Sequence, residues 1–134
     1  MTEQASAPAA TPHHLFAGYE RVGDLAFVSL RVQGQLTHND YAIITPLMEA
    51  AAASAKRAGL SLLFDMSQMT GWEPEALVDD IQLALRMHKR VHKVALVAPQ
   101  PWQQRLFAAM SQLLPVQAQC FTQPQPAIDW LHAK

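Results

Sequence analysis

The fold is decided by the stretch from Leu60 to Trp72, which reads LSLLFDMSQMTGW. Its first five residues form a short apolar run, typical of a strand that is buried on both faces of a sheet. A polar turn ending at Gly71 follows, and a proline between two glutamates at positions 73–75 then favours the first turn of a helix. In open α/β sheets, sites collect where the carboxyl end of a strand leads into a helix. We therefore expect the loop from Asp65 to Glu73 to border any functional site.

Short apolar runs and helical patterns alternate on both sides of this stretch. They predict strands over residues 15–21, 25–32, 60–64, 91–98 and 116–121, and helices over residues 37–58, 74–90, 101–114 and from 124 onward. Gly34 is expected to end the second strand. Thr37 and Asp40 resemble a capping box for the first helix, and Pro46 is expected either to kink that helix or to delay its start to about Thr45. The order predicts an α/β fold whose mixed, mostly parallel sheet has right-handed crossovers.

The totals are those of an ordinary globular protein of 134 residues, long enough for one domain with a real core. We expect residues 13–134 to form this domain and the Ala/Pro/Thr-rich residues 1–12 to be a disordered leader. A net charge of −1 argues against a general nucleic-acid binder. The single cysteine, Cys120, excludes an internal disulfide and is expected to be an inert thiol in a strand. Without a secretory signal or an apolar run of about 18 to 20 residues, a soluble cytoplasmic protein is expected.

The helix predicted over residues 74–90 has more apolar surface than one sheet needs. One face, which we expect to pack on the sheet, carries the residues Leu77, Val78, Ile81, Ala84, Leu85 and His88. A second, narrower ridge carries Ala76, Leu83 and Met87. This ridge needs a partner of its own, which is a neighbouring helix, a ligand, a second subunit or a membrane surface.

No constellation of residues points to catalysis or to a metal or cofactor site. The sequence has no Gly-rich phosphate loop, G-x-S-x-G, H-E-x-x-H or C-x-x-C motif. His88 and His92 are four residues apart, but a strand is predicted to begin between them, so they are not expected to bind one metal ion. Asp79 and Asp80 are adjacent and therefore diverge by about 100° on a helix, which does not make an acid/base pair. Asp80 borders the second ridge, where it could hold a functional proton, but we expect a solvated or salt-bridged helix acid.

The only dense group of basic residues follows that ridge, and it contains Arg86, Lys89, Arg90 and Lys93. Cations near the C-terminus of a helix stabilise it by about 0.3 to 1 kcal/mol, which explains them without a ligand. The alternative is attraction to anionic lipid headgroups, worth roughly 1 kcal/mol for each Lys or Arg near such a surface.

Taken together, these features resemble the SpoIIAA-like family, a branch of the STAS fold. The residues that carry the resemblance are Leu36, Asp40, Tyr41, Leu47, Leu63, Phe64, Asp65, Gly71, Trp72, Asp79, Asp80, Val94, Ala95, Leu96, Val97, Trp102, Phe121, Ala127, Trp130 and Leu131. The resemblance implies a single STAS-like domain with a four- to five-stranded sheet flanked by helices. It also implies a binding or regulatory module, and for this branch the binding of an apolar ligand or contact with a membrane.

The resemblance has one clear departure. Anti-sigma-factor antagonists of this fold are switched by phosphorylation of a serine in a motif like Asp-Ser-Ser-Gly, which falls here on residues 73–76 and reads EPEA. Pro74 cannot accept a phosphoryl group. Ser67 and Thr70 lie nearby, but hydroxyls beside an aspartate in a turn usually cap or form the turn. We therefore expect no phosphoserine switch.

The sequence favours a non-enzymatic binding module for an apolar or lipid-like small molecule, with peripheral membrane association. The expected ligand-binding residues are Trp72, Leu83, Met87 and Trp102, with Arg86 and Lys89 as headgroup contacts. The alternative is a protein-interaction regulator, including a homodimer, that uses the same ridge against a polypeptide. No catalytic residue, cofactor or metal is expected.

Overall fold

The computed structural model describes residues 13–22, 25–55, 59–112 and 116–133. The leader predicted at residues 1–12 lies outside the described residues. Within the described ranges the elements, in chain order, are β1 (His14–Val22), β2 (Leu25–Leu36), the short 3-10 helix η1 (His38–Asp40), α1 (Tyr41–Ser54), β3 (Leu60–Asp65), β4 (Met69–Trp72), α2 (Pro74–Met87), the 3-10 helix η2 (His88–Arg90), β5 (Val91–Val97), α3 (Pro101–Ser111), β6 (Ala118–Phe121) and α4 (Pro124–His132).

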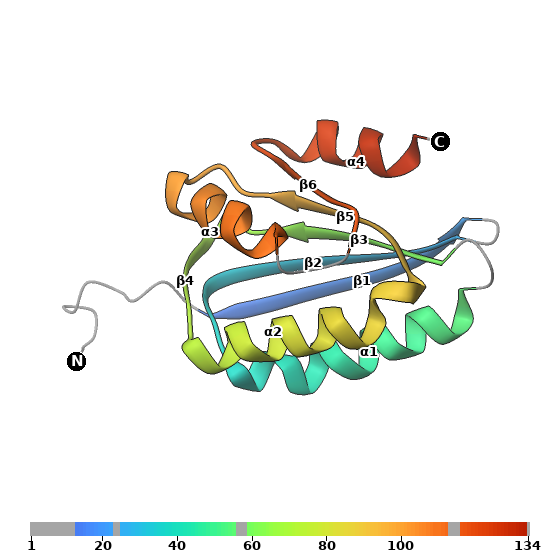
Figure 1. The fold of residues 1–134 in the computed structure, drawn as a ribbon, viewed down its shortest axis with the longest axis horizontal. Helices are drawn as coiled ribbons and strands as arrows, with labels where there is room; N and C mark the ends of the chain where they lie inside the picture. Colours follow the sequence, from blue (N-terminus) through green and yellow to red (C-terminus); the bar gives the residue numbers. More distant parts are fainter. Residues whose placement is uncertain (1–12, 23–24, 56–58, 113–115, 134) are drawn as a thin grey trace, which may run out of the picture.

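The sheet follows the order β1-β2-β3-β5-β6, and β4 pairs with the C-terminal end of β2. Only the opening hairpin of β1 and β2 is antiparallel, and the other pairs are parallel. Helices cover both faces: α1 and α2 lie side by side on one face, and α4 lies on the other (Figure 1). This arrangement confirms the predicted α/β class with a mixed, mostly parallel sheet, although the sheet has six strands.

The core divides into two parts that follow the two faces of the sheet. The larger part lies under α1 and α2 and includes Leu60, Phe64 and Met87. The smaller part lies under α4, where Ala95 and Val97 of β5 contact residues of that helix. Neighbouring residues of β3 and β5 therefore contribute to opposite layers, as the short apolar runs predicted.

The strand that was not predicted is β4, which lies in the stretch expected to be a polar turn. The strand β2 does not end at Gly34 but continues to Leu36, because Gly34 adopts a positive φ of 89° that glycine tolerates. The pairing of β2 with β3 ends at Arg31, and from Gly34 onward β2 pairs with β4, with a register shift between Gly34 and Gln35. The predicted turn up to Gly71 therefore contains a strand, so Trp72 is held by backbone pairing with Leu36.

The start of the first helix agrees with its predicted cap. The Thr37 side chain and the Asp40 backbone form a capping box with the Asp40 carboxylate, which accepts the Thr37 N–H at 2.8 Å. The helix α1 then runs from Tyr41 through Pro46 to Ser54, so its regular part does not begin at Thr45. Pro46 is exposed, and α1 is helical on both sides of it. The helix therefore continues although proline lacks the N–H that would bond to the preceding turn.

The two apolar faces of α2 are the reverse of the prediction. The narrow ridge, with Ala76, Leu83 and Met87, is the buried face of the helix. On the face expected to pack on the sheet, Val78 is 53% exposed and Leu85 is 49% exposed. Both faces are apolar, so periodicity could not choose between them. The choice depends on α1, which occupies the neighbouring part of the sheet and determines how α2 can rotate onto it.

Candidate functional site

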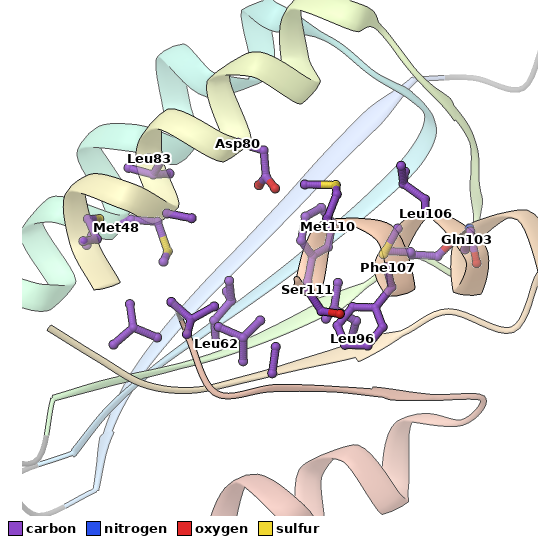
Figure 2. A pocket seen from close by; sticks show the side chains of 18 of the residues that line it. Met48, Leu62, Asp80, Leu83, Leu96, Gln103, Leu106, Phe107, Met110 and Ser111 are labelled. Atoms are coloured by element: carbon purple, nitrogen blue, oxygen red, sulfur yellow. Dashed lines mark hydrogen bonds between the residues drawn. The ribbon is translucent and has the colours of Figure 1, made fainter. Parts of the chain in front are cut away.

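A cavity of about 120 Å³ lies between α2 and α3, above the strands β3, β5 and β6 (Figure 2). Asp80 and Leu83 reach it from α2, and Phe107 and Met110 reach it from α3 on the opposite side. The floor is formed by strand residues that include Leu62, Phe64, Val94, Leu96 and Ala118. The cavity exists because α1 and α2 pack together, whereas α3 stands at the other edge of the same face.

The lining is almost entirely apolar, and most of its polar groups are already bonded. Gln103 is fully buried, and its Nε2 donates to the Met66 carbonyl oxygen at 2.7 Å. Its Oε1 accepts the backbone N–H of Gln100 at 3.2 Å, within the capping box of α3. Ser111 Oγ donates to the Ala108 carbonyl at 3.1 Å. Gln103 and Ser111 therefore shape the cavity and stabilise its helix without offering a strong contact to a ligand.

The exception is Asp80, whose carboxyl group forms a single hydrogen bond among the described residues. The Tyr41 hydroxyl donates to Asp80 Oδ1 at 2.7 Å and links α1 to α2. The residue as a whole is partly exposed, but its carboxyl is desolvated, and this desolvation raises the pKa of Asp80 while the Tyr41 bond lowers it. Burial and the nearby Asp80 raise the pKa of Tyr41, so the phenol keeps its proton. Asp80 is thus a carboxyl in an apolar wall with one bonded oxygen.

Trp72 lines the same cavity and carries a buried polar atom. Its Nε1 is buried and has no hydrogen-bond partner among the described residues. The ring lies edge-on to Phe64, with centroids 6.4 Å apart. Buried donors normally have a partner, and an unpaired one costs about 1 to 3 kcal/mol. The strand β4 therefore places an unpaired donor in a residue that lines the cavity.

The structure brings half of the expected ligand-binding residues together. Trp72, Leu83 and Met87 all line the cavity. Trp102 lies outside the lining and packs against the main core at the start of α3. Arg86 and Lys89 are exposed on the solvent side of α2 and η2.

Of the four basic residues grouped at positions 86–93, Lys93 is buried. Arg86 Nε lies 3.6 Å from Glu49 Oε2, in an exposed ion pair of little energetic weight. Lys93 is only 6% exposed, and its Nζ donates to the carbonyls of Trp130 and Ala133, both at 2.8 Å. Lys93 therefore binds the C-terminal end of α4 and is not available to a lipid surface.

Three features of the cavity were missed at the level of sequence. Asp80 was expected to be a solvated or salt-bridged acid, although its position beside the buried ridge was recognisable. Tyr41 gave no local signal, since it lies 39 positions from its partner. Leu106, Phe107 and Met110 lie on a clean helical stripe that predicts core packing, and the stripe does not reveal a hollow beside it.

A second polar cluster lies next to this site, where η1 meets the start of α2. His38 Nδ1 is bonded to Asp79 Oδ2, and this contact raises the pKa of His38. The His38 N–H donates to Glu73 Oε1 at 2.9 Å, and His13 Nε2 lies 3.0 Å from Asp40 Oδ2. The two His38 contacts hold the start of α2 against η1. In the described part of the chain, no group of three or more His, Cys, Asp or Glu side chains is arranged to hold a metal ion.

The buried carboxyl predicts a pH dependence of stability that Asp80→Asn removes. The folded state raises the pKa of Asp80 above its ordinary value of 3.8, so folding favours the neutral form. This contribution is complete below the ordinary pKa and is lost as the pH rises through the folded-state pKa. The free energy of unfolding is measured with urea from below the ordinary pKa of Asp80 to above its folded-state pKa. It should fall with rising pH more steeply for the wild type than for the Asn variant. Parallel curves would show that the carboxyl is hydrated in the folded protein.

Comparisons with known proteins agree with this architecture. A family model described as SpoIIAA-like matches residues 27–132. An uncharacterised protein with a SpoIIAA-like fold from Shewanella loihica PV-4 is 28% identical, with 92% of this chain and 98% of that chain covered and a TM-score of 0.73. An anti-sigma factor antagonist from Mycobacterium paratuberculosis is 12% identical, with coverage of 90% and 96% and a TM-score of 0.57.

The Bacillus cell fate determinant SpoIIAA in its phosphorylated form is 17% identical, with coverage of 87% and 100% and a TM-score of 0.55. At these identities, the similarity to the Mycobacterium and Bacillus proteins shows a shared fold. No curated protein matches the sequence. Among the described residues, no helix is both long enough and apolar enough to cross a bilayer.

Proposed function

Since the chain belongs to the SpoIIAA-like family, we propose that it is a non-enzymatic binding module that holds an apolar or amphipathic small molecule between α2 and α3. The observation that carries this proposal is the cavity of about 120 Å³ with its almost wholly apolar lining. Apolar cavities of roughly 150 Å³ stay dry and accept benzene-sized molecules. A ligand of that size restores the dispersion contacts that the lining side chains lack.

The residues around the cavity support binding better than catalysis. Asp80 is the one titratable side chain in the described lining, and its hydrogen-bond partner Tyr41 keeps its proton. Nucleophilic or general acid/base catalysis needs a nucleophile or base beside a group that activates it and a site for the developing charge. A single carboxyl in an apolar hollow fits the recognition of a ligand.

A membrane surface is the proposed source of the ligand. Val78 and Leu85 are exposed on the outer face of α2, and Arg86, Lys89 and Arg90 are exposed at its C-terminal end. An apolar face beside basic side chains suits the interface of an anionic bilayer. Flotation with vesicles of phosphatidylcholine, with and without phosphatidylserine, tests this part. Flotation only with the anionic vesicles is expected, and its absence would restrict the proposal to a ligand taken from solution.

The cavity itself is tested by filling it. Ala84 of α2 lines the cavity, whereas Ala108 of α3 is exposed, so Ala84→Phe should block binding and Ala108→Phe should not. Toluene is the probe in NMR titrations of both variants and the wild type, and native mass spectrometry of gently purified protein detects any retained ligand. We expect saturable shifts at cavity residues in the wild type and in the Ala108 variant. Equal binding by all three proteins, or none by the wild type, would contradict the proposal.

A protein-interaction regulator, including a homodimer, is the second candidate. The exposed Val78 and Leu85, which lie two turns apart on one face of α2, favour it, because an exposed apolar helix face can mark a protein interface. Its site is the outer face of α2 and not the inner ridge. Pro74 at the first turn of α2 leaves this candidate without a phosphoserine switch at that position. A dimer that Leu85→Asp converts into a folded monomer in sedimentation velocity would favour this candidate over the first.

A further inference from the structure

The polar atoms of the cavity wall point to the chemistry of its ligand. Gln103 and Ser111 are committed to backbone carbonyls, as described above. Two polar groups of the described lining residues remain without a partner. They are the second carboxyl oxygen of Asp80, since the first is bonded to Tyr41, and the N–H of Trp72. Every other described lining side chain is apolar. Among the described lining residues, these two groups are therefore the ones left to pair with a polar group of a ligand.

We propose that Asp80, in its neutral form, donates a hydrogen bond to the ligand, and that the cavity selects apolar molecules with one uncharged acceptor such as a ketone or aldehyde carbonyl. Trp72 Nε1 is the second donor for the same acceptor. This inference rests on the proposed binding function and adds to it the class of ligand. Asp80 and Trp72 are thus specificity residues in a cavity whose affinity comes mainly from apolar contact.

The surroundings of Asp80 explain why the neutral form is the one that recognises the ligand. An unpaired carboxylate is costly in an apolar environment, and this carboxyl has no cationic partner within the described residues. Charges that act on the Tyr41–Asp80 pair come from Asp40 of η1 and Asp79 of α2, and both are acidic. The described side chains that β3, β5, β6 and α3 contribute to the lining include no titratable group.

Hydrogen-bond geometry then assigns the donors. Tyr41 already donates to Oδ1, so a protonated Asp80 has its own O–H left to donate. Trp Nε1 is a donor only. Two donors and an apolar wall complement a carbonyl oxygen, which has two lone pairs. An ammonium group instead requires the charged carboxylate and a buried ion pair, whose desolvation opposes binding.

The test compares three molecules of equal size: cyclohexanone, methylcyclohexane and protonated cyclohexylamine. Dissociation constants come from ¹⁵N NMR titrations of the full chain, and the Trp72 indole signal is assigned with Trp72→Phe. We expect cyclohexanone to bind about three- to tenfold more tightly than methylcyclohexane, the value of one net hydrogen bond. The Trp72 indole N–H signal should move with the ketone and not with the hydrocarbon.

Variants at position 80 separate this inference from the proposed function. Asp80→Asn keeps one acceptor and one donor, so it should retain the ketone preference at every pH. In the wild type the preference should decline as the pH rises through the pKa of Asp80. Asp80→Leu combined with Tyr41→Phe should bind methylcyclohexane and lose most of the preference, with Trp72 as the remaining donor. If this double variant fails to fold, the contrast between the wild type and Asp80→Asn across pH decides.

Each outcome has one meaning. Binding of ketone and hydrocarbon with equal affinity would overturn the inference and leave the proposed function standing. Tightest binding of cyclohexylamine, lost in Asp80→Asn, would assign a charged carboxylate and overturn it as well. Failure of all three molecules to bind would count against the proposed function itself.

Discussion

Leu83→Asp should destabilise the protein by about 3 to 5 kcal/mol, while Leu85→Asp, two residues away on the same helix, should change its stability by no more than about 0.5 kcal/mol. Leu83 is 7% exposed and packs in the main core, so the substitution places a carboxylate among apolar side chains, one turn from Asp80. Leu85 is 49% exposed, so an aspartate there remains hydrated. Single domains are stable by only about 5 to 15 kcal/mol, so the first change approaches unfolding.

Urea unfolding followed by circular dichroism measures both variants against the wild type. The pair is matched because both substitutions have the same chemistry and lie within one helix, so differences in helix propensity cancel. Equal losses of stability at the two positions would mean that α2 presents its other face to the sheet. The buried ridge described above would then be incorrect, and the cavity with it.

Lys93→Met should cost about 2 to 3 kcal/mol, whereas Lys89→Met should be nearly neutral. The Lys93 ammonium donates to two carbonyls at the C-terminal end of α4 and lies 4.9 Å from the centroid of the Trp130 ring. Methionine preserves the apolar part of the side chain but removes the ammonium donor from both carbonyls, at the end of the helix where a positive charge is most stabilising. Lys89 is exposed, and its loss removes only a solvated charge.

Hydrogen exchange distinguishes this local effect from general destabilisation. In Lys93→Met, amide protection should fall first in α4, where Ala127 and Leu131 pack on the sheet, and remain in α1. A uniform loss of protection, or equal effects of the two lysine substitutions, would contradict a capping role. Retained binding of anionic vesicles by the Lys93 variant is also expected, since this lysine is buried.

The match between sequence and structure is close wherever the signal is local. The capping box of Thr37 and Asp40, the prolines that open α2 and α3, and the apolar runs of β3 and β5 each depend on neighbours within a few residues, and each was predictable. The short strand β4 was not. Its four residues carry no clear alternation, and its existence depends on the end of β2, more than 30 positions earlier, being free to pair with it.

The candidate site shows the same division. Trp72, Leu83 and Met87 could be singled out because α2 has more apolar surface than one sheet contact requires. Which of its two faces is buried could not be read from a pattern that both faces satisfy. Asp80 could be placed beside the ridge, but its role depends on Tyr41 from another helix, and the inward position of Lys93 depends on α4.

The amino-acid sequence by itself determined the α/β class, the order of most elements, the helix caps and the family resemblance, because periodicity, capping and turn chemistry act over a few residues. Only the tertiary structure decided the rotation of α2, the hollow between α2 and α3, the Tyr41–Asp80 hydrogen bond and the unpaired N–H of Trp72. Each of these depends on how separate helices divide the surface of one sheet. That division depends on the shapes of all the side chains at once, which no single stretch of the chain contains.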